Sequence, residues 1–149
     1  MKKIVVIVGF LFVFISCNNQ KREEMAKTNL EQFTKDYIEA WSTTNPNERQ
    51  QLIEEVYATS AEFYANEPGD DAVEHHGLEK IYENITQVNE RLVVGNGLIT
   101  ESTGYSENHN TLRVTWQMKT PNGEVVMKGM NFLILDKTGK IAKDFIFIN

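Results

Sequence analysis

The sequence has one cysteine, three prolines and fewer basic than acidic side chains, 15 against 21. A lone cysteine cannot form an internal disulfide bond, which excludes a disulfide-stapled scaffold. The formal net charge of −6 argues against nucleic acid and anionic lipid as partners of the protein surface. The sequence also lacks a phosphate-binding loop, a nucleophile motif and a cluster of metal-ligating residues, so it predicts neither a cofactor nor a metal site.

The apolar stretch near the start of the chain, Ile4–Ile15, is too short for a membrane span, which takes roughly 20 residues. It follows Lys2 and Lys3 and is interrupted only by Gly9. A basic pair followed by an apolar run of this length is typical of a secretory signal peptide. We therefore predict that residues 1–16 are a signal peptide.

The single cysteine, Cys17, closes this apolar stretch directly after a small residue. The run 13–17, Val-Phe-Ile-Ser-Cys, resembles the lipobox of bacterial lipoproteins, with Phe14 where leucine is commonest. The resemblance implies that Cys17 is lipidated; the alternative is an incidental cysteine at a secretory cleavage site. Cleavage before Cys17 removes two lysines and changes the formal charge from −6 to −8.

The lipobox resemblance also implies a location. The polar residues 17–27 then form a lipidated tether, and the protein lies in the bacterial cell envelope, facing the periplasm or the cell exterior. Because the chain is acidic, its attachment to the membrane would rely on acyl chains rather than on a basic patch.

The remaining residues, 28–149, have the length of a single domain. A capping box starts a helix over about 29–42, and Asn45 followed by Pro46 starts a second helix. The spacing of apolar residues places Tyr57 on the buried side of this second helix. The pattern further predicts a strand over Ala61–Ala65, a polar loop over 66–77, a third helix over about Leu78–Arg91, and strands over about 98–108, 111–120, 124–135 and 140–148.

Two strand-like runs joined by Pro121-Asn122-Gly123 predict a β-hairpin. In the first arm, alternate residues between Leu112 and Met118 are apolar and share one face. In the second arm, Asn131 is out of step with Lys128, which needs water, so Asn131 is expected on the inner face. Helices followed by an antiparallel meander indicate an α+β fold rather than a doubly wound one.

Short motifs along the chain match one known family in order and spacing. They are Trp41 with Ala61-Glu62-Phe63-Tyr64, Gly77-Leu78-Glu79-Lys80-Ile81, His109 to Trp116 as H-x-x-x-R-x-x-W, Gly129-Met130-Asn131-Phe132 and Gly139-Lys140-Ile141. Together they resemble the SnoaL-like branch of the nuclear transport factor 2-like superfamily. The resemblance implies a cone of three N-terminal helices packed in a curved, mainly antiparallel sheet, with a pocket at the open end. It implies no single function, because this superfamily holds isomerases, dehydratases, polyketide cyclases and non-catalytic binding domains.

The resemblance also suggests which residues line the pocket. The candidate ligand-binding residues are Tyr37, Trp41, Tyr57, Tyr64, Trp116 and Asn131. Such a site would be mostly apolar with few polar groups, as small-molecule sites usually are. Packing in the core is the alternative for the helical aromatic residues, and a structural hydrogen bond is the alternative for Asn131.

Catalytic members of this family use a carboxylate base or an aspartate–histidine pair deep in the cone. Here Asn131 replaces the aspartate of the strand motif, and an amide cannot act as a general base. Asp144 interrupts an apolar strand and is the preferred replacement, with Asp36 on the first helix as the other candidate. His109 and Tyr64 are the candidates to assist Asp144.

We therefore expect a lipid-anchored, extracytoplasmic domain that binds a small apolar or amphipathic molecule. The alternatives are a proton-transfer enzyme of the isomerase, dehydratase or cyclase type, and a protein-interaction module. An apolar stripe on the outer sheet face also predicts a homodimer through the sheet. The stripe consists of Val126, Met130, Phe132 and Ile134.

Overall fold

The computed structural model describes residues 29–65 and 72–149. The chain divides into two compact units, Met1–Gln32 and Phe33–Asn149, and the sheet and the helices packed against it belong to the second. The predicted signal peptide and tether, including Cys17, lie outside the described residues. Within the part of the chain that is described, no helix is long and apolar enough to cross a membrane.

The first two helices match their predicted positions. The first helix covers residues 29–42. The second, α2, is Pro46–Val56, with proline in its first turn. It begins where the Asn45 side chain accepts hydrogen bonds from the backbone N–H groups of Asn47 and Glu48, at 3.0 and 3.4 Å. These two bonds satisfy N–H groups that have no partner inside the helix, which explains why the helix starts there.

The third helix is longer than predicted and changes type. α3, Leu78–Asn89, follows Gly77, whose φ of 85° favours glycine. The chain then continues as a π-helix, η1, Glu90–Gly95, past the predicted end at Arg91. The wider turn of a π-helix is rare and is frequently found at functional sites.

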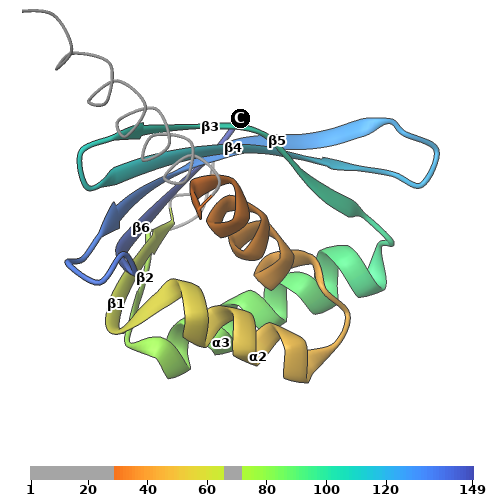
Figure 1. Cartoon of the computed structure of the whole chain (residues 1–149). Helices are drawn as coiled ribbons and strands as arrows, with labels where there is room; N and C mark the ends of the chain where they lie inside the picture. The colour runs from red at the N-terminus through yellow and green to blue at the C-terminus, as the bar shows by residue number, and fades with distance from the viewer. Residues whose placement is uncertain (1–28, 66–71) are drawn as a thin grey trace, which may run out of the picture. The chain divides into compact units, whose positions relative to one another are not determined.

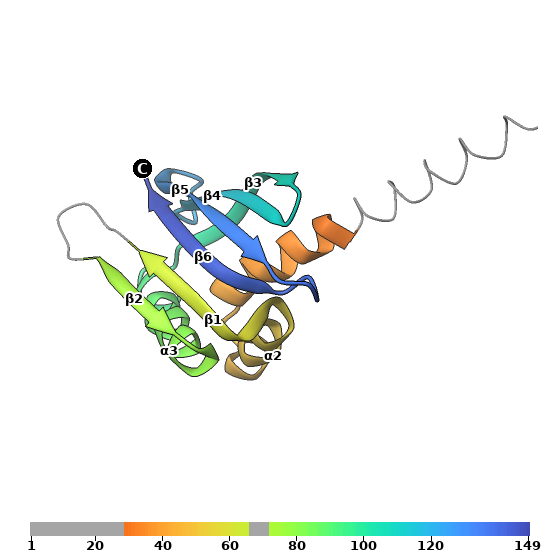
Figure 2. The same cartoon turned by 90° about the vertical axis from the view of Figure 1, so that its left-hand side faces the viewer.

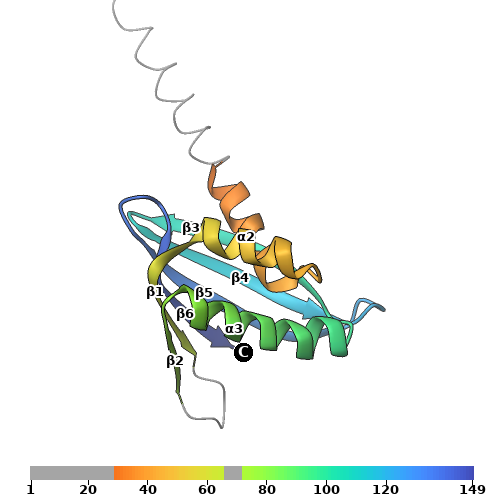
Figure 3. The same ribbon diagram turned by 90° about the horizontal axis from the view of Figure 1, so that it is seen from below.

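One six-stranded sheet supplies the other layer, with the strand order β2-β1-β6-β5-β4-β3 (Figure 1). β1 and β6 run parallel, and every other neighbouring pair is antiparallel; Figure 2 shows β6 between β1 and β5. The strands are β1 Tyr57–Ala65, β2 Val73–His76, β3 Ile99–Asn108, β4 Thr111–Lys119, β5 Val125–Leu135 and β6 Ile141–Ile148. The helices of the second unit lie on one face of this curved sheet (Figures 1 and 3), which is the predicted α+β arrangement.

Two details of the predicted pattern are wrong. Tyr57 opens β1 instead of ending the second helix, and its backbone is extended, with φ −100° and ψ 143°. Apolar spacing misplaces it because a buried residue just after a helix end continues the helical stripe. Val73–His76, predicted as loop, form the edge strand β2, which pairs only with β1. Its side chains are mostly exposed, so no alternation of apolar and polar residues marks it.

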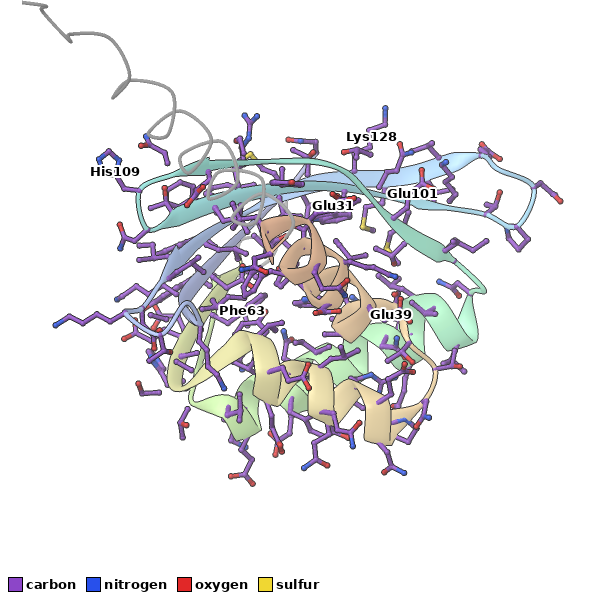
Figure 4. All side chains as sticks on the ribbon, in the orientation of Figure 1. Glu31, Glu39, Phe63, Glu101, His109 and Lys128 are labelled. Atoms are coloured by element: carbon purple, nitrogen blue, oxygen red, sulfur yellow. The ribbon has the colours of Figure 1, made fainter. Side chains whose placement is uncertain are left out.

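The β4–β5 hairpin has the predicted faces. Trp116 lies opposite Gly129 in the register of the two strands. Asn131 is 1% exposed, whereas Lys128 points away from the helices on the outer face (Figure 4). A side chain is excluded at Gly129, since a Cβ atom there would collide with the Trp116 ring and lie 2.6 Å from the Phe147 carbonyl oxygen. The Trp116 indole therefore lies directly against the backbone of β5.

A buried arginine joins the three helices. Arg49 of α2 is 3% exposed and makes no ion pair with any residue that the structure describes. Its guanidinium donates to the Thr43 carbonyl oxygen at 2.8 Å, to Asn89 Oδ1 at 2.5 Å and to Thr86 Oγ1 at 3.5 Å. Asn89 in turn donates to the carbonyl oxygens of Trp41 and Thr43, at the end of the first helix. We call Thr43, Arg49, Thr86 and Asn89 the Arg49 cluster.

Candidate functional site

A cavity of about 420 Å³ lies between the inner face of the sheet and the first and third helices. Its walls are mostly apolar and include side chains from all six strands as well as from α3 and η1. Four of the six predicted ligand-binding residues line it, namely Tyr37, Trp41, Trp116 and Asn131. Both tryptophans of the chain are therefore in its walls. A site of this kind takes an apolar body and orients it with a few polar groups.

Asn131 is the polar residue at the inner end of the cavity, and its amide orientation is fixed. Its Oδ1 accepts a hydrogen bond from Trp116 Nε1 at 2.8 Å, and its Nδ2 donates to Asp144 Oδ1 at 2.6 Å. An indole N–H can only donate and an ionised carboxylate can only accept, so the opposite orientation of the amide would lose both bonds. Strand parity thus places Asn131 correctly, inside and beside Trp116.

Asp144 is a fully buried carboxylate, at 0% exposure, held by three donors. Besides Asn131, the hydroxyl groups of Tyr37 and Tyr57 donate to its Oδ2 at 3.0 and 2.6 Å. Burial raises the pKa of Asp144 from 3.8 to about 6, and the three hydrogen bonds oppose this rise because they stabilise the charged form. No ion pair with Asp144 is present among the described residues. We call Tyr37, Tyr57, Trp116, Asn131 and Asp144 the Asp144 cluster.

The two tyrosines of this cluster remain donors at neutral pH. Burial, followed by the charge of Asp144, raises the pKa of Tyr37 and of Tyr57 well above its usual value. The indole of Trp41 opposes the rise for Tyr57, although Trp41 Nε1 makes no hydrogen bond of normal geometry with a described residue. A Tyr–Asp–Tyr arrangement of this kind satisfies the carboxylate oxygens without any cation.

Asp144 itself does not line the cavity, and neither does Asp36, the other predicted carboxylate. Tyr37 and Asn131 line it, and both donate to Asp144, so one layer of side chains separates the carboxylate from a bound molecule. The carboxylate acts on the cavity through these two neighbours. A direct proton transfer would require Tyr37 or Asn131 to move aside.

Three predicted site residues lie elsewhere. Tyr57 belongs to the Asp144 cluster but not to the cavity wall. Tyr64 lies on the outer sheet face, where its hydroxyl donates to Glu62 and its ring stacks on Phe145 at a centroid distance of 4.9 Å. His109 is exposed, has a φ of 58° in the β3–β4 turn, and points away from the sheet in Figure 4. Neither Tyr64 nor His109 is in position to assist Asp144.

Sequence reasoning missed several lining residues. Phe63 precedes Tyr64 and therefore points to the opposite face, inward (Figure 4). There its ring packs against the Trp41 ring, with 5.7 Å between the ring centroids. Alternation along β1 could have found it. Arg91, Leu92 and Val93 also line the cavity. They belong to the π-helix, whose wider turn has no sequence signal that could have revealed it.

The described residues do not form a binding site for a metal ion. Among residues 29–65 and 72–149, no three His, Cys, Asp or Glu side chains converge on a position that could hold a metal ion. The polar and charged side chains of the cavity wall are those of Tyr37, Asn84, Arg91, Thr100 and Asn131, together with the indole N–H groups of the two tryptophans.

Solved structures share this fold. A candidate isomerase of the SnoaL-like family from Agrobacterium tumefaciens is 18% identical, with a TM-score of 0.69 over 79% of this chain and 95% of that one. A nuclear transport factor 2-like protein of unknown function from Exiguobacterium is 20% identical, with a TM-score of 0.58 over 78% and 98%. A candidate polyketide cyclase from Sinorhizobium meliloti is 15% identical, with a TM-score of 0.55 over 78% and 94%. No protein-family model and no curated protein matches the sequence.

Proposed function

We propose that this nuclear transport factor 2-like domain binds a small apolar or amphipathic molecule in its cavity, as the extracytoplasmic part of a lipid-anchored bacterial protein. The observation that carries the binding proposal is the cavity of about 420 Å³, with mostly apolar walls and a hydrogen-bonded polar group at its inner end. Solved structures with this fold have names that include isomerase and cyclase, but at this identity they support the fold alone.

The binding proposal is tested by filling the cavity. Val88 of α3 lines it and is half-buried, so Val88→Phe places extra atoms inside. We expect this variant to lose most of the binding of an uncharged fluorescent probe, Nile red, that the parent shows. Val94→Phe is the matched control, because Val94 of η1 is 58% exposed and does not line the cavity. Equal probe binding by the parent and Val88→Phe, or none by the parent, would reject the proposal.

The proposed lipid anchor rests on Cys17 and the apolar stretch before it. Cys17→Ser should release the protein from the membrane fraction or leave the precursor uncleaved. A variant that fractionates and migrates like the parent would reject the anchor, and would leave the binding proposal untouched.

The proposed homodimer rests on the apolar stripe of the outer sheet face. Val126 is 49% and Phe132 37% exposed, with Met130 and Ile134 half-buried beside them. Exposed apolar patches of this kind are usually covered by a partner. Light scattering of the domain from Lys27 onward should give the mass of a dimer at micromolar concentration, and a monomer would count against it.

A proton-transfer enzyme is the second candidate, and one observation favours it. Asp144 is a buried carboxylate with a pKa of about 6, the property expected of a general base that works near neutral pH. Because Asp144 lies behind Tyr37 and Asn131 and does not line the cavity, we rank the enzyme below the binding function. Turnover of a cyclic ketone by the parent but not by Asp144→Asn would reverse the order.

A further inference from the structure

One charged side chain reaches the cavity. Arg91, in η1, is the only Lys, Arg, His, Asp or Glu among the described residues that line it. Arg91 is also exposed, as is Val73 elsewhere in the lining, whereas Asn131 is 1% exposed, so Arg91 lies on the solvent side of the cavity and Asn131 at the inner end. The walls of the cavity are therefore mostly apolar, with one cationic side chain on the solvent side.

The guanidinium of Arg91 has no partner in the described part of the chain. It makes no ion pair and no hydrogen bond there, although three of the four ion pairs of that part join lysines to glutamates. Its neighbours along η1, Leu92 and Val93, are apolar and also line the cavity. A guanidinium has five donors in a planar fork that matches a carboxylate, and the described residues supply no acceptor for this one.

The inner end of the cavity has the opposite electrostatic character. Asp144 lies one layer behind Asn131 and Tyr37 and makes no ion pair with a described residue. Its carboxylate repels an anion placed deep in the cavity, and Arg91 attracts one at the opening. A molecule with an apolar body and an acid group would therefore enter body first.

We propose that the ligand is an anionic amphiphile, a carboxylic acid with an apolar body, whose carboxylate pairs with Arg91 at the opening. This rests on the proposed binding function and adds the chemical class of the ligand and its direction in the cavity. Because Arg91 is exposed, water and salt weaken the pair, and the preference for an anion is modest.

Three probes with the same tail separate the effect of the head group: dodecanoate, dodecanol and dodecyltrimethylammonium. Each is titrated below the concentration at which it forms micelles, at a pH where the acid is ionised. Trp41 and Trp116 are the only tryptophans of the chain and both line the cavity, so intrinsic fluorescence reports its occupancy. The parent should bind dodecanoate most tightly and the alkylammonium least.

Arg91→Gln should weaken dodecanoate binding by about two- to fivefold, the upper range for an exposed pair, and leave dodecanol binding unchanged. Arg113→Gln, an exposed arginine on β4 outside the cavity lining, is the matched control and should change neither. Dodecanol binding as tightly as dodecanoate, in the parent and in Arg91→Gln, would reject the anion preference and keep the proposed function. Tightest binding of the alkylammonium would assign the cavity to organic cations. Binding of none of the three would reject the proposed function itself.

Discussion

The Asp144 cluster and the Arg49 cluster both bury a charge that forms no ion pair with a described residue, yet they differ in what they touch. Arg49 donates mainly to the end of the first helix, through the Thr43 carbonyl and Asn89, while its buried Nε has no acceptor among the described residues. A helix C-terminus carries partial negative charge, which stabilises a cation placed there. Asp144 is satisfied by side chains, two of which form the cavity wall.

The difference separates a structural charge from one connected to a site. Burying an uncompensated charge is costly wherever it occurs. In the Arg49 cluster the result is a connection among three helices, and none of its four residues lines the cavity. In the Asp144 cluster the result is a polar part of the cavity wall, because Tyr37 and Asn131 both line the cavity and donate to Asp144. If this contrast holds, substitutions in the Asp144 cluster and in the Arg49 cluster should differ in their effects on stability, pH dependence and probe binding.

The largest effect is expected from Asn131→Leu. It removes one donor from the Asp144 carboxylate and leaves the Trp116 N–H without an acceptor. A hydrogen bond to a charged group and a stranded buried donor together correspond to a loss on the order of 4 kcal/mol in the free energy of unfolding. Denaturant titration measures it. Asn84→Leu is the control, because Asn84 lines the same cavity without a hydrogen bond to any described residue, and it should leave stability nearly unchanged.

Asn131→Leu also decides between the two roles predicted for this residue. The network around Asn131 favours a structural role with loss of stability. A variant with parental stability and weaker probe binding would instead make Asn131 a ligand contact, and the Asp144 cluster would then contribute less to stability than its hydrogen bonds indicate.

The second prediction concerns pH and Asp144. Folding raises the pKa of this carboxyl from 3.8 to about 6, so the folded state binds the proton more tightly than the unfolded state. The stability that Asp144 contributes is therefore highest below pH 3.8, falls as the pH rises toward about 6, and is constant above. At about 1.4 kcal/mol for each tenfold change, the fall is on the order of 3 kcal/mol.

This dependence is measured as the difference between the unfolding free energies of the parent and Asp144→Asn at each pH. Hydrogen bonds lower the pKa values of three other carboxyl groups, those of Glu62, Glu101 and Asp136. The stability that these groups contribute to the folded state is lost in acid. Their contributions occur in both proteins and cancel in the difference. If the difference falls by less than about 1 kcal/mol between pH 4 and pH 7, Asp144 is not buried as described.

The third and smallest prediction concerns Arg49. Arg49→Met keeps the unbranched apolar stem of the side chain but removes the guanidinium, so the buried Asn89 Oδ1 loses its donor, which should lower the free energy of unfolding by about 1–3 kcal/mol. Arg113→Met, an exposed arginine, should change it by less than about 0.5 kcal/mol. Probe binding and the pH difference should both match the parent. A change in probe binding would show that the two clusters are not independent.

Local chemistry made much of this arrangement predictable from the sequence. The Asn45 cap and Pro46 marked the start of α2, and the need of Lys128 for water fixed the parity that puts Asn131 inside. The burial of Arg49 was not predictable, because its acceptors come from the first helix and from α3 and meet only in the folded state. The Asp144 cluster likewise joins residues as far apart as Tyr37 and Asp144, so the sequence suggested the carboxylate but not its two tyrosine donors.

The contrast between the clusters is tested most directly by the carboxyl carbon-13 NMR titration of Asp144, with the cavity free and with it saturated by dodecanol. We expect Asp144 in the free protein to titrate near pH 6. Filling the cavity with an apolar molecule should raise that pKa further, because the surroundings of the carboxylate become less polar. Titration near the ordinary value of 3.8, or a pKa that does not change when dodecanol binds, would contradict a buried Asp144 connected to the cavity.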